Sequence, residues 1–217
     1  MRESFENKKK RANVIFKRLG KIYPKAKCAL IHSSVWELLV ATVLSAQCTD
    51  KRVNIVTPPL FKGFPTVKAF AECDLADLER AIHSTGFYRN KAKNIKGAAQ
   101  KVLSDFGGKV PDTMEELVTL PGIARKSANV LLYAWFGKNE GVVVDTHVKR
   151  ISNRLGLTSE KIPEKIEKDL MKLYPRKDWG QFAYYIVDHG RALCKAPTPK
   201  CAECDLQDIC PAAKLYL

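Results

Sequence analysis

The chain has 217 residues, of which 46% are hydrophobic and 28% are charged, the balance of a globular protein large enough to bury a core. Its formal net charge of +14 favours a polyanionic partner, either nucleic acid or an anionic membrane surface, with a solvated basic surface as the alternative. The longest apolar stretch, residues 35–46, is too short to span a bilayer, and no apolar run follows the charged N-terminus, which argues against a membrane span and a signal peptide.

Helical periodicity dominates the chain. Residues 3–22 alternate basic and apolar positions with helical spacing. Ser34 and Glu37 form a capping-box pattern that opens an apolar helix reaching to about Gln47. Period-two alternation is confined to residues 141–144, so we expect an all-α fold. Further helices are expected over residues 75–83, 90–106, 113–119, 122–135, 145–155, 163–173 and 179–192.

A tight turn, Leu120-Pro121-Gly122-Ile123-Ala124, connects two of these helices. Proline presets a turn, and glycine lets the backbone approach another molecule closely. The helix that follows begins with unpaired N–H groups and the positive end of its dipole, which together can bind a phosphate without reading sequence. Pro-Gly more often marks a simple connection between two helices than a phosphate-binding site. The net positive charge of the chain makes phosphate binding and a simple connection equally supported.

Lys126 falls in the first turn of the helix after this hairpin, next to Arg125. A helix N-terminus disfavours a charged ammonium, and a neutral amine is a nucleophile toward an electrophilic sugar or carbonyl carbon. A solvated surface lysine is the alternative.

Asp145 leaves an extended segment to open a helix, as an ordinary N-cap does. A cap also fixes a carboxylate where it can accept a proton from an amine or stabilise a developing cation.

The cysteines near the C-terminus follow the pattern C-x6-C-x2-C-x5-C, which predicts a metal site. Zinc sites usually pair their cysteines as two close Cys-x-x-Cys units, whereas only one close pair is present here. On spacing alone, zinc and an iron–sulfur cluster are equally supported. The other cysteines lack paired spacing, which suits a reducing cytosol rather than a disulfide scaffold. The predicted metal ligands are Cys194, Cys201, Cys204 and Cys210.

The hairpin, the lysine, the Val-Asp-Thr-His segment and the cysteine spacing together resemble the endonuclease III family of helix-hairpin-helix DNA glycosylase/lyases, from about Ser34 to Cys210. The resemblance implies an enzyme that removes oxidised pyrimidines, with Lys126 as its nucleophile and Asp145 as its catalytic aspartate. Lys126 would attack the anomeric carbon and form a Schiff base, and β-elimination would then cut the strand. The resemblance also favours a [4Fe–4S] cluster over zinc.

Several DNA contacts are implied in the same way. Gln47 matches the residue that fills the gap left by an extruded nucleotide. Phe87 stands where the family usually has a leucine wedge, a change that could alter opposite-base preference. Ala124 replaces a common second hairpin glycine but keeps its backbone N–H. The implied DNA-binding residues are Gln47, Phe87, Leu120, Gly122, Ala124, Lys195 and Lys200.

The resemblance further implies a two-lobed architecture. Residues 28–138 would form a six-helix barrel, and residues 1–27 and 139–217 would form a cluster domain from both chain ends. We expect a monomer that acts on double-stranded DNA with damaged bases or abasic sites, in the cytoplasm of a prokaryotic cell and associated with its nucleoid.

Three alternatives stay open at this point. A mismatch-specific glycosylase is one, although the adenine enzymes usually lack this lysine and the thymine-mismatch relatives typically place tyrosine at the position of Lys126. A non-catalytic iron–sulfur module that binds DNA is another, against which Lys126 and Asp145 argue together. An iron–sulfur electron carrier is the third, and it would need neither the hairpin nor so basic a surface.

Overall fold

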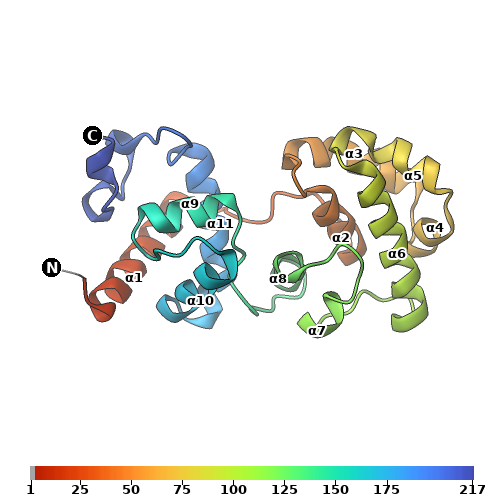
Figure 1. The fold of residues 1–217 in the computed structure, drawn as a ribbon, viewed down its shortest axis with the longest axis horizontal. Helices are drawn as coiled ribbons and strands as arrows, with labels where there is room; N and C mark the ends of the chain where they lie inside the picture. The colour runs from red at the N-terminus through yellow and green to blue at the C-terminus, as the bar shows by residue number, and fades with distance from the viewer. Residues whose placement is uncertain (1–2) are drawn as a thin grey trace. The chain divides into compact units, whose positions relative to one another are not determined.

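The computed structural model describes residues 3–217, and all regular secondary structure in that range is helical. The first two residues of the predicted cluster domain lie outside the described range. The chain divides into two compact units, one formed by Cys28–Lys138 and the other by residues up to Lys27 together with Asn139–Leu217 (Figure 1). No helix in the described range is long and apolar enough to cross a membrane.

The unit formed by Cys28–Lys138 is built around α2 (Val35–Leu44), whose residues from Leu38 to Leu44 are all buried. α2 packs against α3 (Asp50–Gly63), α6 (Tyr88–Phe106) and α8 (Arg125–Ala134). An almost continuously apolar helix needs neighbours on every side, which is why it becomes the centre of this core. The remaining elements of the unit are α4 (Val67–Glu72), α5 (Leu75–Ile82), η1 (His83–Thr85) and α7 (Met114–Leu117).

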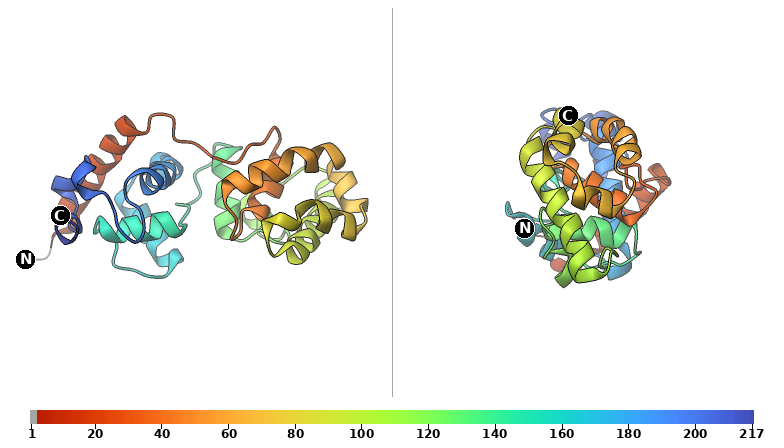
Figure 2. Two further views of the ribbon diagram at one scale, coloured as in Figure 1. Left: turned by 90° about the horizontal axis from the view of Figure 1, so that it is seen from above. Right: turned by 90° about the vertical axis from the view of Figure 1, so that its right-hand side faces the viewer.

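The second unit draws its core from both ends of the chain. α1 (Phe5–Ile22) packs against α10 (Pro163–Leu173) and α11 (Trp179–Ala192), and α11 also packs against α9 (Thr146–Arg154). The segment after α11 returns to α1 (Figure 2). There Arg18 pairs with Asp208 through both terminal nitrogens of its guanidinium group. That segment contains the short 3-10 helices η3 (Cys201–Glu203), η4 (Gln207–Ile209) and η5 (Ala213–Leu215), and η2 (Arg176–Asp178) precedes α11.

The predicted all-α fold is confirmed, and the predicted helices are present with shifted ends. α2 ends at Leu44 instead of about Gln47, because Gln47 adopts a left-handed conformation that no α-helix continues through. Ser34 caps α2 as predicted, but Glu37 reaches back to the N–H of Ser33 and not to that of Ser34. The helices α3 and α4 were not predicted; α3 contains Pro58 and Pro59, which break a helical pattern in sequence.

Candidate functional site

The hairpin of residues 120–124 is held against α6. Gly122 has φ of +81°, and a Cβ atom built on it would lie 2.9 Å from the Cβ of Asn94. Only glycine adopts that conformation without strain and also permits so close an approach. Leu120 and Ile123 are 2% and 4% exposed, so they anchor the turn in the core. Leu120 was predicted to contact DNA; its side chain is buried, which leaves its backbone for that role.

The helix that leaves the hairpin presents its N-terminus without a side-chain cap. Ala124 occupies the N-cap position of α8 and makes no side-chain hydrogen bond to the first turn. Ala124, Arg125 and Lys126 are all exposed. The first N–H groups of an uncapped helix have no hydrogen-bond acceptor within the helix. A phosphate oxygen can accept from them, and the helix dipole also attracts its negative charge. Lys126 therefore stands in the first turn of an anion-binding helix terminus.

Gln47 and Phe87 share an unusual backbone conformation. They are the non-glycine residues with positive φ in the part of the chain that the structure describes, at +52° and +49°. Both are exposed, Phe87 to 63%. A left-handed conformation at a large side chain costs about 1 kcal/mol or more and persists where the surroundings impose it, which happens often at functional sites. Nothing in the sequence marks these backbone angles, although both residues were predicted as DNA contacts.

Asp145 is the N-cap of α9. Its Oδ1 accepts a hydrogen bond of 2.7 Å from the N–H of Val148, and the carboxylate is half-buried. Val144 and Val148 on either side are buried at 9% and 0% exposure, which fixes the backbone that carries the carboxylate. His147 packs so closely against Gly190 of α11 that a Cβ at that glycine would collide with the imidazole. The position of Asp145 is therefore set by a cap and by tight packing between helices.

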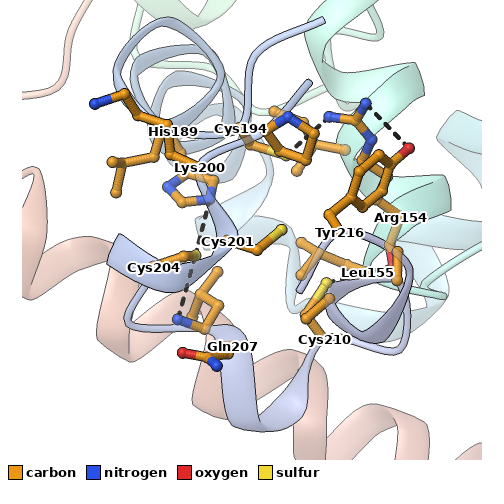
Figure 3. A pocket seen from close by; sticks show the side chains of 16 residues that line it. Arg154, Leu155, His189, Cys194, Lys200, Cys201, Cys204, Gln207, Cys210 and Tyr216 are labelled. Atoms are coloured by element: carbon orange, nitrogen blue, oxygen red, sulfur yellow. Dashed lines mark hydrogen bonds between the residues drawn. The ribbon is translucent and has the colours of Figure 1, made fainter. Parts of the chain in front are cut away.

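The cysteine side chains predicted to bind a metal line one pocket in the second unit (Figure 3). Arg154 donates from Nη1 to Sγ of Cys194 at 3.4 Å, and the N–H of Leu206 donates to Sγ of Cys204 at 3.4 Å. Donors aimed at sulfur are what thiolate ligands require, because a thiolate accepts and does not donate. The pocket is lined by Cys194, Cys201, Cys204 and Cys210, together with Arg154 and His189.

The residues present bear on the kind of metal. The pocket supplies four cysteine side chains as donors. Thiolate sulfur binds zinc ions and iron–sulfur clusters alike. The residues present therefore fit either of these two metal groups.

The surroundings of the pocket keep its polar groups in defined states. Burial raises the pKa of the Cys204 and Cys210 thiols, so without metal they hold their protons at neutral pH and ligation displaces them. Burial lowers the pKa of His189 to about 4, so its imidazole is neutral. The hydroxyl of Tyr23 lies 3.1 Å from Nδ1 of His189 and fixes the ring beside the pocket.

Arg154 also organises the loop between the first two cysteines. Its guanidinium donates to the carbonyl oxygens of Lys195 at 2.8 Å and Pro197 at 2.9 Å. Lys195 and Lys200 are exposed, but Lys200 pairs with Glu203 at 3.0 Å. Sequence reasoning found the lysines and missed Arg154, because an arginine in the last turn of an amphipathic helix carries no distinctive pattern.

The predicted residues are thus distributed over both units. Gln47, Phe87, the hairpin and Lys126 belong to Cys28–Lys138. Asp145, the cysteine pocket and its basic loop belong to the other unit.

Comparison with known proteins gives consistent matches. Residues 40–176 match the family described as HhH-GPD superfamily base excision DNA repair protein. The chain is 56% identical to "Endonuclease III" of Synechocystis sp. over 208 residues, covering 96% of this chain and 95% of that protein. Two solved structures, a non-covalent Endonuclease III–DNA complex and a trapped Endonuclease III–DNA covalent intermediate, each superpose with a TM-score of 0.91 at 39% identity, covering 95% of this chain and 97% of theirs.

Proposed function

The chain belongs to the endonuclease III family of the HhH-GPD superfamily of base excision DNA repair proteins, and on that premise we propose that Lys126 is its nucleophile and Asp145 its catalytic carboxylate. It is a DNA glycosylase and AP lyase of base excision repair. One observation carries the assignment of the nucleophile: Lys126 is exposed in the uncapped first turn of α8, directly after a hairpin packed against α6.

The first step is binding of the duplex through its phosphates. The N–H groups at the start of α8 and the backbone of the hairpin take one phosphate, and the excess of basic side chains adds affinity that is independent of sequence. Lys195, exposed on the loop between the first two cysteines in the other unit, is a further basic contact for the phosphate backbone. Such contacts position the enzyme but do not identify the lesion.

The second step is extrusion of the damaged nucleotide, because a base inside the stack is out of reach of any nucleophile. Gln47 and Phe87 enter the gap that the nucleotide leaves. Both side chains are exposed and both stand on a constrained backbone, so little ordering remains to be done when they meet DNA. A phenylalanine ring stacks against bases as well as wedging them apart.

The third step is the chemistry at the sugar. The carboxylate of Asp145 stabilises the positive charge that develops on the sugar and accepts a proton from the Lys126 ammonium as the amine attacks C1′. The bond to the damaged base breaks, and the base leaves with the second proton, which the new C1′–N bond gives up. Ring opening gives a Schiff base, which acidifies C2′; loss of a C2′ proton then expels the 3′ phosphate and cuts the strand.

A [4Fe–4S] cluster is proposed for the cysteine pocket, with Cys194, Cys201, Cys204 and Cys210 as its ligands. When bound, such a group cross-links the segment after α11 and orders the loop that carries Lys195. Arg154 and the N–H of Leu206 supply hydrogen bonds to two of the sulfurs. The substrate class we propose is oxidised pyrimidines in duplex DNA, met in the cytoplasm of a prokaryotic cell at its nucleoid.

A strand-cleavage assay tests the proposed substrate and nucleophile together. The chain should release an oxidised pyrimidine such as thymine glycol from a duplex and cut that strand, and it should leave a duplex with a T·G mismatch intact. Lys126→Ala should lose cleavage, while Lys168→Ala, at an exposed lysine on α10, should retain it. Cleavage of the T·G duplex in preference to the oxidised one would replace the proposed substrate with a mismatch.

A further inference from the structure

Lys91 is a buried lysine that the reaction described above does not use. It lies in the first turns of α6 and is only 4% exposed. Its Nζ donates to the carbonyl oxygens of Leu44 and Thr85, each at 2.8 Å. Its backbone N–H donates to the carbonyl oxygen of Phe87 at 3.1 Å. Burial lowers the pKa of this ammonium, and the two carbonyl contacts favour its charged form.

The two carbonyl groups belong to the segments that carry Gln47 and Phe87. Leu44 ends α2, and the turn that follows contains Gln47. Thr85 ends η1, and Gly86 then leads directly into Phe87. One ammonium group therefore ties together two loops that are distant in sequence. In each loop, an exposed residue in the left-handed conformation follows two or three residues after the carbonyl group that Lys91 contacts.

We propose that Lys91 is a positioning residue that sets the spacing of Gln47 and Phe87, so that both side chains can enter the duplex at once. The inference rests on the proposed role of these residues in filling the gap. The end of α2 presents carbonyl groups without partners in the helix, and a cation there is favoured by the helix dipole. Three rotatable donors on one nitrogen allow a lysine to bind two carbonyls at once, which a neutral residue of this length does not.

Lys96 provides a matched comparison on the same helix. Its Nζ donates to the carbonyl oxygen of Cys73 at 2.6 Å, and it is half-buried. That contact joins α6 to the turn between α4 and α5, which carries none of the proposed DNA contacts. Removal of the Lys96 ammonium leaves one backbone carbonyl short of a donor and removal of the Lys91 ammonium leaves two, so the unfolding midpoint of each variant is measured beside its activity. Only the change at Lys91 frees the loops of Gln47 and Phe87.

The test compares Lys91→Met with Lys96→Met in single-turnover assays on a lesion duplex with 2-aminopurine opposite the lesion. The fluorescence of 2-aminopurine reports unstacking of the gap, which a purely structural role would not change selectively. We expect Lys91→Met to lower the unstacking signal and to slow base release by about 10- to 100-fold, as misplacement of a positioned group does. Lys96→Met should change neither by more than about 2-fold, and binding of undamaged duplex should be equal in both variants.

A double-mutant cycle separates this inference from the proposed function. In a Gln47→Ala/Phe87→Ala background, Lys91→Met should slow base release by less than about 2-fold further, because there is nothing left to position. If the background double variant itself retains full activity, the gap-filling role is wrong. If that variant is impaired but Lys91→Met is harmless, or slows release equally in both backgrounds, the inference about Lys91 is overturned.

Lys91→Gln covers the case in which Lys91→Met does not fold. Glutamine keeps the site polar, but its side chain is one bond shorter than lysine and its two N–H groups are fixed in one plane, so it should reach one carbonyl and not both. The same loss of unstacking is expected, with circular dichroism and the unfolding midpoint as checks on the fold. If neither variant folds, Lys91 is required for the whole unit and a specific role at the two loops is refuted.

Discussion

Gly122 of the hairpin lies so close to Asn94 of α6 that a side chain on the glycine would collide with the asparagine. A Cβ on Gly122 would lie 2.9 Å from the Cβ of Asn94, and the glycine has φ of +81°. Pro121 next to it contacts Gly97, where a built Cβ would lie 3.3 Å from the proline ring. The hairpin therefore packs on α6 at two glycines, Gly122 and Gly97. The distance between the hairpin and α6 sets the orientation of the first turn of α8.

Gly122→Ala should damage this arrangement through both backbone strain and the contact with Asn94. We expect the free energy of unfolding to fall by about 1–3 kcal/mol and the affinity for duplex DNA to fall by about 10-fold or more. Urea unfolding and fluorescence anisotropy measure the two effects. Gly63→Ala is the control, since a Cβ there would meet nothing within 4 Å; it should leave the affinity for DNA unchanged and should not lower the free energy of unfolding.

Asp145→Asn should separate the structural role of this residue from its catalytic one. Asparagine caps a helix as well as aspartate does, so the unfolding midpoint should change little, while base release should slow by about 100-fold or more because the negative charge is lost. Asp145→Ala should lose activity and in addition cost about 1 kcal/mol of stability. An active Asp145→Asn enzyme would reduce this residue to a helix cap.

Lys195→Ala should weaken DNA binding through loss of one phosphate contact. Because Lys195 is exposed, the slope of log Kd against log salt should become shallower by about one, without change in lesion preference. Glu203→Gln should have the opposite effect, since it frees Lys200 from its ion pair for a phosphate. An unchanged slope in both variants would show that this loop does not meet the DNA backbone.

The metal content of the purified protein tests the proposal for the cysteine pocket. We expect about four irons per chain and a brown colour, both lost in Cys204→Ser because that thiol is one of the four proposed ligands that line the pocket. Arg154→Met should keep the iron but make the cluster easier to bleach, since Cys194 loses its donor. Stoichiometric zinc without iron would assign the pocket to a mononuclear site.

The regular parts of the fold follow from local sequence. Ser34 and Asp145 cap helices where the pattern predicts, Thr113 caps α7, and Gly107 ends α6 in the left-handed conformation. The helix α3 could not be predicted in this way because Pro58 and Pro59 interrupt it, and only tertiary packing of its apolar face retains the helix.

The site was less accessible to sequence reasoning than the helices. Residue types and spacing indicated Lys126, Asp145 and the cysteines, but left zinc and iron–sulfur equally supported. Lys91 could not be found, because in this lysine-rich chain nothing distinguishes a buried lysine from an exposed one. The left-handed angles of Gln47 and Phe87 are likewise imposed by the contacts around them, and a non-glycine sequence carries no sign of them.

The most direct test of the account is to locate the covalent adduct. Borohydride reduction of the wild-type protein on a duplex with an oxidised pyrimidine should trap a stable cross-link, and peptide mass spectrometry should place it on Lys126. Lys126→Ala should trap nothing, and Lys168→Ala should trap as much as the wild type. An adduct on any other amine, or undiminished trapping by Lys126→Ala, would contradict the assignment of Lys126 as the nucleophile.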